Sequence, residues 1–228
     1  EQVFAACAAG TGRCGARFPR LRADWQALLA SLPREVEVAH PLTGQRERVT
    51  LTRDIVLGLV RAPLYAPALA SALPLALADA SEGRVAALFG LASALQGGGR
   101  AGQLAEGMHY AVGCAEDLPR MPAGAGSTTD SGGQGFGGTF AEHYRRVCAD
   151  WPRGEVPAAF YEVPPAPAAA LVLSGGADPV TPPRHGERVA RARGAKTRHV
   201  VVPEAGHGVM VLPCMRDVIF RFVDADDD

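Results

Sequence analysis

Two short apolar segments near the C-terminus constrain the fold more than any other feature. Residues 170–174 and 199–202 are continuous apolar runs of the kind found in strands buried on both faces. A loop and then a helical segment follow each run, with the helices expected at 184–193 and 214–223. This order predicts two parallel strands joined by a right-handed crossover. The fold class is therefore α/β.

The first hundred residues have a different, mostly helical pattern. Apolar residues recur with helical spacing over 1–31, and alternating valines over 36–51 predict a small hairpin. Thr52 is placed to cap the helix that follows. Two further helices are expected at 65–80 and 81–95, the first bent or restarted at Pro67 and Pro74.

Composition divides the rest of the chain. Residues 121–138 are rich in Gly, Ser and Thr and predict a flexible loop, because no strand precedes the glycines and no phosphate-binding lysine follows them. The expected organisation is a helical cap, the flexible loop, a re-entry helix with a Pro-rich connector, and the C-terminal part of the core, at 1–120, 121–138, 139–169 and 170–228.

The charge balance excludes some classes of partner. The chain has 23 Lys and Arg against 24 Asp and Glu, a formal net charge of −1. Nucleic-acid binding needs a basic excess on at least one face, so we expect no nucleic-acid partner. No uninterrupted apolar stretch reaches the ~18 residues of a membrane span, and we expect no membrane partner either.

The five cysteines favour an oxidising compartment. None belongs to a C-x-x-C motif, which gives little support to a zinc or thioredoxin-like site. Two disulfides and one unpaired cysteine allow five choices of the unpaired residue and three connectivities for each. The preferred pairing is Cys7–Cys14 and Cys114–Cys148, leaving Cys214 single; five buried, reduced thiols are the alternative.

Asp178 and His207 are the candidate catalytic residues. Each lies in a loop after one of the two predicted strands, and ligand sites of open α/β sheets lie at those strand ends. Asp178 would accept a hydrogen bond from His207 Nδ1 and leave Nε2 as a general base. An ordinary turn aspartate and a surface histidine are the plain alternatives. A metal site from His185, His199 and His207 is the rival, and it lacks an H-E-x-x-H motif.

Several segments resemble one family as a set. LVLSGGADPVTPPRHGERVAR at 171–191, HVVVPEAGHGVM at 199–210 and CMRDVIFRF at 214–222 resemble the C-terminal end of α/β-hydrolases of the tripeptidyl-aminopeptidase and proline-iminopeptidase-like type. The Cys7-x6-Cys14 spacing, GMHYAVGCAED at 107–117 and CADWPRG at 148–154 are similar to their cap and re-entry segments. The resemblance implies that Asp178 is the triad acid and His207 the triad base. It also implies a secreted or periplasmic protein.

The sequence departs from this family in one respect. Such enzymes carry the nucleophilic serine in a G-x-S-x-G elbow, and none of the seven serines here lies in that motif. We therefore expect the early strands, the elbow and the oxyanion donors to lie upstream of Glu1. The chain would then be the cap plus the last two strands and helices of a hydrolase, and the missing N-terminal half a partner of this part.

The preferred function is the C-terminal portion of a serine exopeptidase that removes residues or short peptides from peptide N-termini. An exopeptidase must recognise a free ammonium group, and Glu116 and Asp117 are the candidate carboxylates; an acidic helix start is their plain interpretation. Two alternatives stay open: a nucleophile-less binding module of the same fold, and an esterase acting on small molecules. We expect a peptide or small-molecule substrate and neither cofactor nor metal.

Overall fold

The computed structural model divides the chain into two compact units. It describes residues 1–9, 13–40, 43–96, 105–122, 136–165 and 168–225. One unit contains Glu1–Leu95 and Val163–Asp228, and the other contains Gln96–Glu162. The sequence-based segment boundaries at 120 and 139 stay a prediction, and most of the loop expected at 121–138 lies outside the described residues. None of the described helices is long and apolar enough to cross a bilayer.

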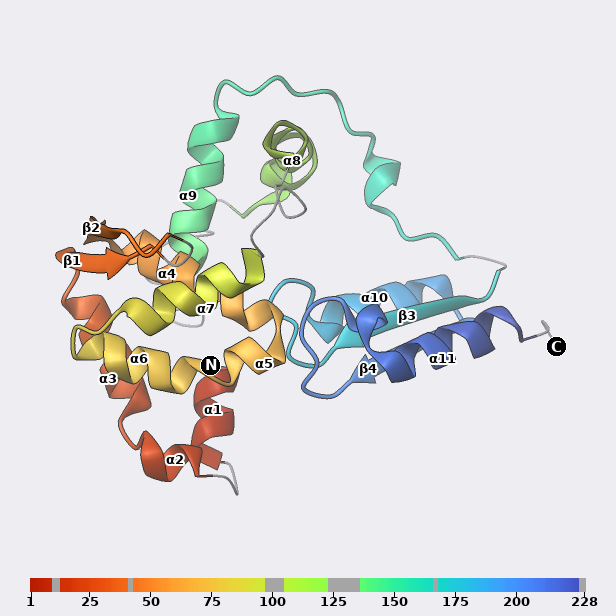
Figure 1. Ribbon diagram of the computed structural model, residues 1–228. Helices are drawn as coiled ribbons and strands as arrows, with labels where there is room; N and C mark the ends of the chain where they lie inside the picture. Colours follow the sequence, from red (N-terminus) through yellow and green to blue (C-terminus); the bar gives the residue numbers. More distant parts are fainter. Residues whose placement is uncertain (10–12, 41–42, 97–104, 123–135, 166–167, 226–228) are drawn as a thin grey trace. The chain divides into compact units, whose positions relative to one another are not determined.

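The N-terminal part of the first unit is a helical bundle with a hairpin (Figure 1). Its elements are α1 (Gln2–Ala9), α2 (Cys14–Arg17), α3 (Leu21–Ala30), β1 (Arg34–Ala39), β2 (Arg46–Leu51), α4 (Arg53–Arg61), the 3-10 helix η1 (Ala62–Tyr65), α5 (Pro67–Ala70), α6 (Leu73–Ser81) and α7 (Ala86–Gln96). Leu28, Leu51 and Val56 are fully buried in its apolar core. The predicted hairpin is confirmed, because β1 and β2 pair antiparallel.

Local signals place several of these helix ends correctly and one incorrectly. Thr52 Oγ1 accepts a hydrogen bond from the Ile55 N–H at 3.3 Å and caps α4, as predicted. The helix expected from residue 81 is wrong at its start, because α6 continues to Ser81 and α7 begins only at Ala86. Gly83 has a φ of +96° and turns the chain between the two helices.

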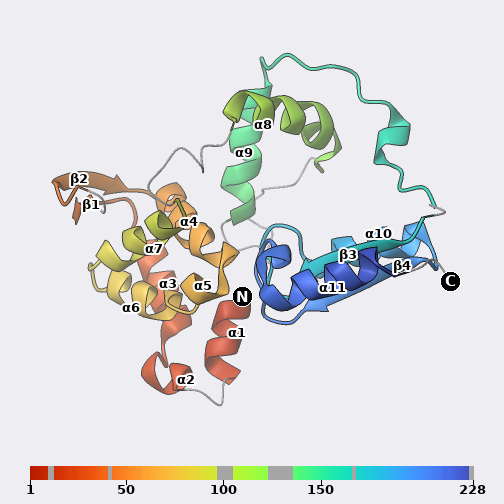
Figure 2. The same cartoon turned by 45° about the vertical axis from the view of Figure 1, so that its right-hand side comes forward.

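The C-terminal part of the first unit contains the predicted strand–helix–strand–helix order. Its elements are β3 (Ala170–Gly175), α10 (Pro183–Arg193), β4 (Thr197–Val202), the short 3-10 helix η6 (Val209–Val211) and α11 (Pro213–Val223). β3 and β4 are parallel, with Ala170 opposite Thr197 and Gly175 opposite Val202. In Figures 1 and 2, α10 and α11 flank these strands.

The expectation that both strands are fully buried is wrong. Most residues of β3 and β4 are only half-buried, and Val201 is 42% exposed. Among the described residues this sheet has two strands, so each strand has a hydrogen-bonded neighbour on one side only. Apolar sequence alone predicts a strand, whereas burial depends on the number of its neighbours.

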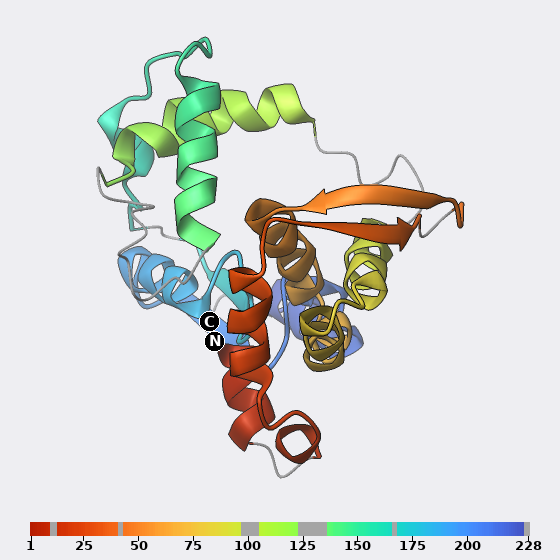
Figure 3. The same ribbon diagram turned by 90° about the vertical axis from the view of Figure 1, so that its left-hand side faces the viewer.

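In the second unit a disulfide cross-links two of the described helical segments. Its elements are α8 (Glu106–Val112), the π-helical turn η3 (Gly113–Asp117), the 3-10 helix η4 (Leu118–Arg120), α9 (Phe136–Cys148) and the 3-10 helix η5 (Ala158–Tyr161). Figure 3 shows α9 crossing α8. The Cys114–Cys148 disulfide is fully buried, and Tyr110, Tyr144 and Trp151 pack around it.

Candidate active site

The loop after β3 and the loop after β4 lie in direct contact. They comprise residues 176–182, the Asp178 loop, and residues 203–208, the His207 loop. The Gly176 N–H donates to the Val202 carbonyl at 2.8 Å, and the Ala177 N–H donates to the Ala205 carbonyl at 2.9 Å. A Cβ at Gly175 would lie 2.1 Å from the Gly206 carbonyl oxygen, so only glycine permits this approach.

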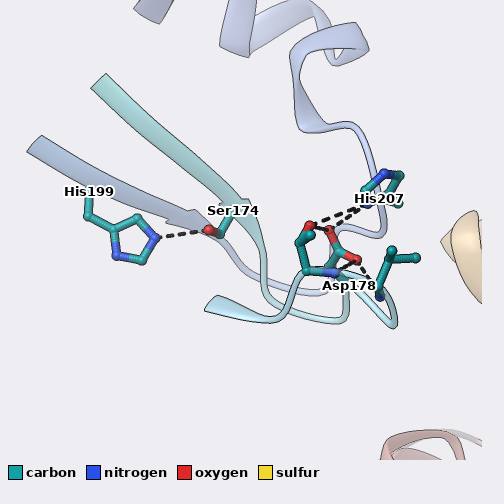
Figure 4. Close-up of polar contacts among 6 residues, drawn as sticks. Ser174, Asp178, His199 and His207 are labelled. Atoms are coloured by element: carbon teal, nitrogen blue, oxygen red, sulfur yellow. Dashed lines mark hydrogen bonds and ion pairs between the residues drawn. The ribbon is translucent and has the colours of Figure 1, made fainter. Parts of the chain in front are cut away.

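This contact brings the two candidate catalytic side chains together, as the sequence predicts. His207 Nδ1 lies 2.9 Å from Asp178 Oδ2 (Figure 4). An ionised carboxylate only accepts hydrogen bonds, so Nδ1 carries the hydrogen and Nε2 is the basic nitrogen. The Asp178 side chain is 4% exposed and the His207 side chain 41% exposed. The acid is therefore shielded from water, while part of the imidazole is accessible.

The Asp178 loop supplies the other partners of the carboxylate. Asp178 Oδ1 accepts hydrogen bonds from the backbone N–H groups of Val180 at 2.7 Å and Thr181 at 2.9 Å. Oδ2 accepts from Thr181 Oγ1 at 2.9 Å, in addition to His207. Burial alone would raise the pKa of Asp178, but these hydrogen bonds outweigh burial and hold its pKa below the ordinary value. The carboxylate is therefore ionised at neutral pH.

A family match covers both loops and their strands. Residues 134–225 match the family model described as Abhydrolase_4, TAP-like protein. Over these residues the chain is similar to the TAP-like α/β-hydrolases. Comparisons with curated proteins and with solved structures give no match. The matched TAP-like region contains Asp178, His207 and Cys214 and begins after Cys114.

The two disulfides of the preferred pairing are present. Cys7 and Cys14 are joined on α1 and α2, Cys114 and Cys148 are joined in the second unit, and Cys214 is free and exposed. These bonds are compatible with an extracellular location.

Glu116 and Asp117 lie in η3, in a different compact unit from Asp178 and His207. Glu116 is half-buried and Asp117 exposed. The Glu116 carbonyl oxygen accepts a hydrogen bond from the Tyr161 hydroxyl at 2.9 Å. In the part of the chain that the structure describes, neither carboxylate forms an ion pair. Their role as an ammonium site stays a proposal.

The structure also shows contacts that the sequence did not indicate. The His207 ring lies edge-on to Tyr65 of η1, with the ring centroids 5.6 Å apart. His199 Nε2 lies 2.9 Å from the buried Ser174 Oγ, a Ser–His contact separate from the Asp178–His207 pair (Figure 4). The spacing of residues along the sequence predicts neither of these two contacts. Thr181, by contrast, lies three residues after Asp178 in the Asp178 loop, so the sequence alone places it close to that residue.

No group of three or more His, Cys, Asp or Glu side chains among the described residues is arranged to hold a metal ion. His199, a member of the rival metal set, has its Nε2 in contact with Ser174 instead. Asp178 and His207 form a hydrogen-bonded carboxylate–imidazole pair.

Proposed function

We propose that Asp178 and His207 are the acid and base of a serine-hydrolase triad in an exopeptidase that acts on peptide N-termini. The observation that supports this proposal best is the 2.9 Å contact between His207 Nδ1 and the buried Asp178 carboxylate. The match to the TAP-like family model over residues 134–225 supports a hydrolase. The exopeptidase specificity rests on the resemblance described in the sequence analysis.

In this mechanism His207 Nε2 removes the proton from a serine hydroxyl while the serine oxygen attacks the scissile carbonyl. The same nitrogen then gives that proton to the leaving amine as the C–N bond breaks. Water releases the acyl group by the same sequence of proton transfers. Asp178 stays ionised throughout and stabilises the imidazolium that forms twice in each cycle.

The proposal assigns the nucleophile to residues outside these 228, because no serine here lies in a G-x-S-x-G motif. Ser174 is a poor candidate, since it is only 6% exposed and its hydroxyl is bonded to His199. The nucleophile would come from a preceding segment or from another chain. Glu116 and Asp117 are the proposed ammonium-binding carboxylates.

The absence of the motif also favours one alternative, a binding module of the same fold that has no nucleophile. Purified residues 1–228 should hydrolyse neither aminoacyl nor tripeptidyl p-nitroanilides. The polypeptide encoded by the complete reading frame should contain G-x-S-x-G and hydrolyse them. A complete reading frame without that motif, whose product does not turn over these substrates, would favour the binding module.

Single variants of the complete polypeptide test the roles of the pair. Asp178→Asn and His207→Ala should each lower kcat by about 10³-fold or more. His185→Ala is the matched control, because His185 is an exposed histidine of the same region, on α10. Turnover of residues 1–228 that His207→Ala abolishes would show that the nucleophile lies within these residues. Turnover of ester substrates without turnover of peptide substrates would favour the esterase alternative, and N-acetylated peptides are the control that an exopeptidase should not cleave.

A further inference from the structure

Thr181 contacts both oxygens of the Asp178 carboxylate. Its backbone N–H donates to Oδ1 and its hydroxyl donates to Oδ2, each at 2.9 Å. Bonds from one residue to both oxygens restrict rotation of the carboxylate plane. The β-branched Thr181 side chain is itself restricted in rotation about χ1, which favours a fixed hydroxyl position.

Three polar atoms meet at this point: Asp178 Oδ2, Thr181 Oγ1 and His207 Nδ1. Oδ2 lies 2.9 Å from each of the other two, and Thr181 Oγ1 lies 3.5 Å from His207 Nδ1. The hydroxyl has one hydrogen, and the charged carboxylate is the stronger acceptor, so this hydrogen points to Oδ2. Both oxygens near Nδ1 then present lone pairs, which favours the imidazole tautomer with its hydrogen on Nδ1.

The remaining neighbours do not provide this function. Val180 bonds Oδ1 only, through its backbone N–H. Tyr65 contacts His207 from η1 through its ring and its backbone carbonyl, not through a charged group. Among the described residues that contact His207, the charged one is Asp178. Thr181 is the residue whose side chain bonds the same Asp178 oxygen, Oδ2, that His207 contacts.

We propose that Thr181 is a positioning residue of the Asp178–His207 pair, whose hydroxyl orients the carboxylate and keeps the imidazole hydrogen on Nδ1. The catalytic consequence rests on the proposed function, whereas the positioning itself does not. Thr181 is exposed to solvent, so its substitution need not disturb a packed core.

Two variants separate the hydroxyl from the shape of the side chain. Thr181→Val keeps the branched shape and removes the donor, and Thr181→Ser keeps the donor and removes the methyl group. The backbone N–H to Oδ1 is present in both. Thr181→Ala is a second hydroxyl-free variant in case valine disturbs the loop.

Nuclear magnetic resonance on purified residues 1–228 tests the positioning without any enzymatic activity. Loss of a hydrogen bond to the ionised form should raise the pKa of Asp178, measured by titration of its side-chain carboxyl carbon. In Thr181→Val and Thr181→Ala, the titration should move upward and the His207 Nδ1 hydrogen should exchange faster with water. Thr181→Ser should match the wild type in both measurements.

Unchanged titration and exchange in both hydroxyl-free variants would overturn the proposal, as would a Thr181→Ser variant that behaves like Thr181→Val. In the complete polypeptide, Thr181→Val should lower kcat about tenfold with little change in KM, while Thr181→Ser should stay within twofold of the wild type. An inactive wild type with the expected resonance changes would contradict the proposed function and leave the positioning supported.

Discussion

The backbone N–H of His207 donates a hydrogen bond of 3.0 Å to the carbonyl oxygen of Tyr65, at the end of η1. The Tyr65 ring also lies edge-on to the imidazole, at an interplanar angle of 77°. Gly206 permits this approach, because a Cβ there would lie 2.2 Å from the Tyr65 oxygen. The position of His207 therefore depends on two segments, the Asp178 loop that holds its side chain and η1 that holds its backbone.

Gly206→Ala should separate His207 from Tyr65. The added methyl group cannot fit against the Tyr65 carbonyl, so either the His207 loop or η1 must move, at a cost of about 1–3 kcal/mol of stability. Hydrogen exchange of the His207 amide should accelerate, and urea unfolding should show the destabilisation. Gly58→Ala is the matched control, because a Cβ at Gly58, within α4, meets nothing within 4 Å. That variant should keep or raise stability by up to about 1 kcal/mol.

The acid sensitivity of the fold should depend on Asp178. Because hydrogen bonds hold the folded-state pKa of Asp178 below its ordinary value of 3.8, its ionised form stabilises the native state above that pH. This stabilisation should disappear as the pH falls through the lowered folded-state pKa. The free energy of unfolding of the wild type should therefore fall more steeply below pH 3.8 than that of Asp178→Asn. Asp217→Asn, at an exposed position of α11, should retain the wild-type slope; a parallel decline in all three proteins would refute the assignment.

The meeting of Asp178 and His207 could be predicted because it depends on local signals. Apolar runs place the two strands, and Gly194, with a φ of +97°, ends α10 as its position in the sequence suggests. Parallel strands then bring both following loops to one edge of the sheet. Each step uses residues close together in the chain or a general rule of topology.

The contacts of His207 with Tyr65 could not be predicted in this way. They join segments that are distant in sequence, and neither a periodic pattern nor a motif records such packing. The burial of β3 and β4 differs from the sequence-based expectation for a related reason. Val201 belongs to an apolar run, yet its exposure depends on the strands and helices next to it rather than on its own sequence.

Ser174 should act as a structural residue and not as a nucleophile. Its hydroxyl is bonded to His199 Nε2, and a Cβ at Gly186 of α10 would lie 2.6 Å from both atoms, so the helix packs closely over the pair. Ser174→Ala should cost about 1–3 kcal/mol, because it leaves the His199 nitrogen without its partner. Ser71→Ala, which removes an exposed hydroxyl bonded to its own helical turn, should cost less than about 0.5 kcal/mol.

Labelling of the complete polypeptide by a fluorophosphonate should be the same in Ser174→Ala as in the wild type. Such reagents modify an activated serine. The Ser174 side chain is buried, and its hydroxyl is hydrogen-bonded to His199 rather than to His207. Loss of labelling in a Ser174→Ala protein that remains folded would instead identify Ser174 as the nucleophile.

The two disulfides should differ in their contribution to stability. Cys7 and Cys14 are separated by 7 residues and Cys114 and Cys148 by 34. Because a longer loop loses more chain entropy when it is closed in the unfolded state, the entropy model gives about 2 kcal/mol for the first bond and about 4 kcal/mol for the second. Double Cys→Ser variants, compared by urea unfolding, should show this order, with Cys214→Ser as the control for loss of an exposed thiol.

Non-reducing peptide mapping should recover both pairs. A bond to Cys214, or a larger loss of stability from the Cys7–Cys14 variant than from the Cys114–Cys148 variant, would contradict the prediction.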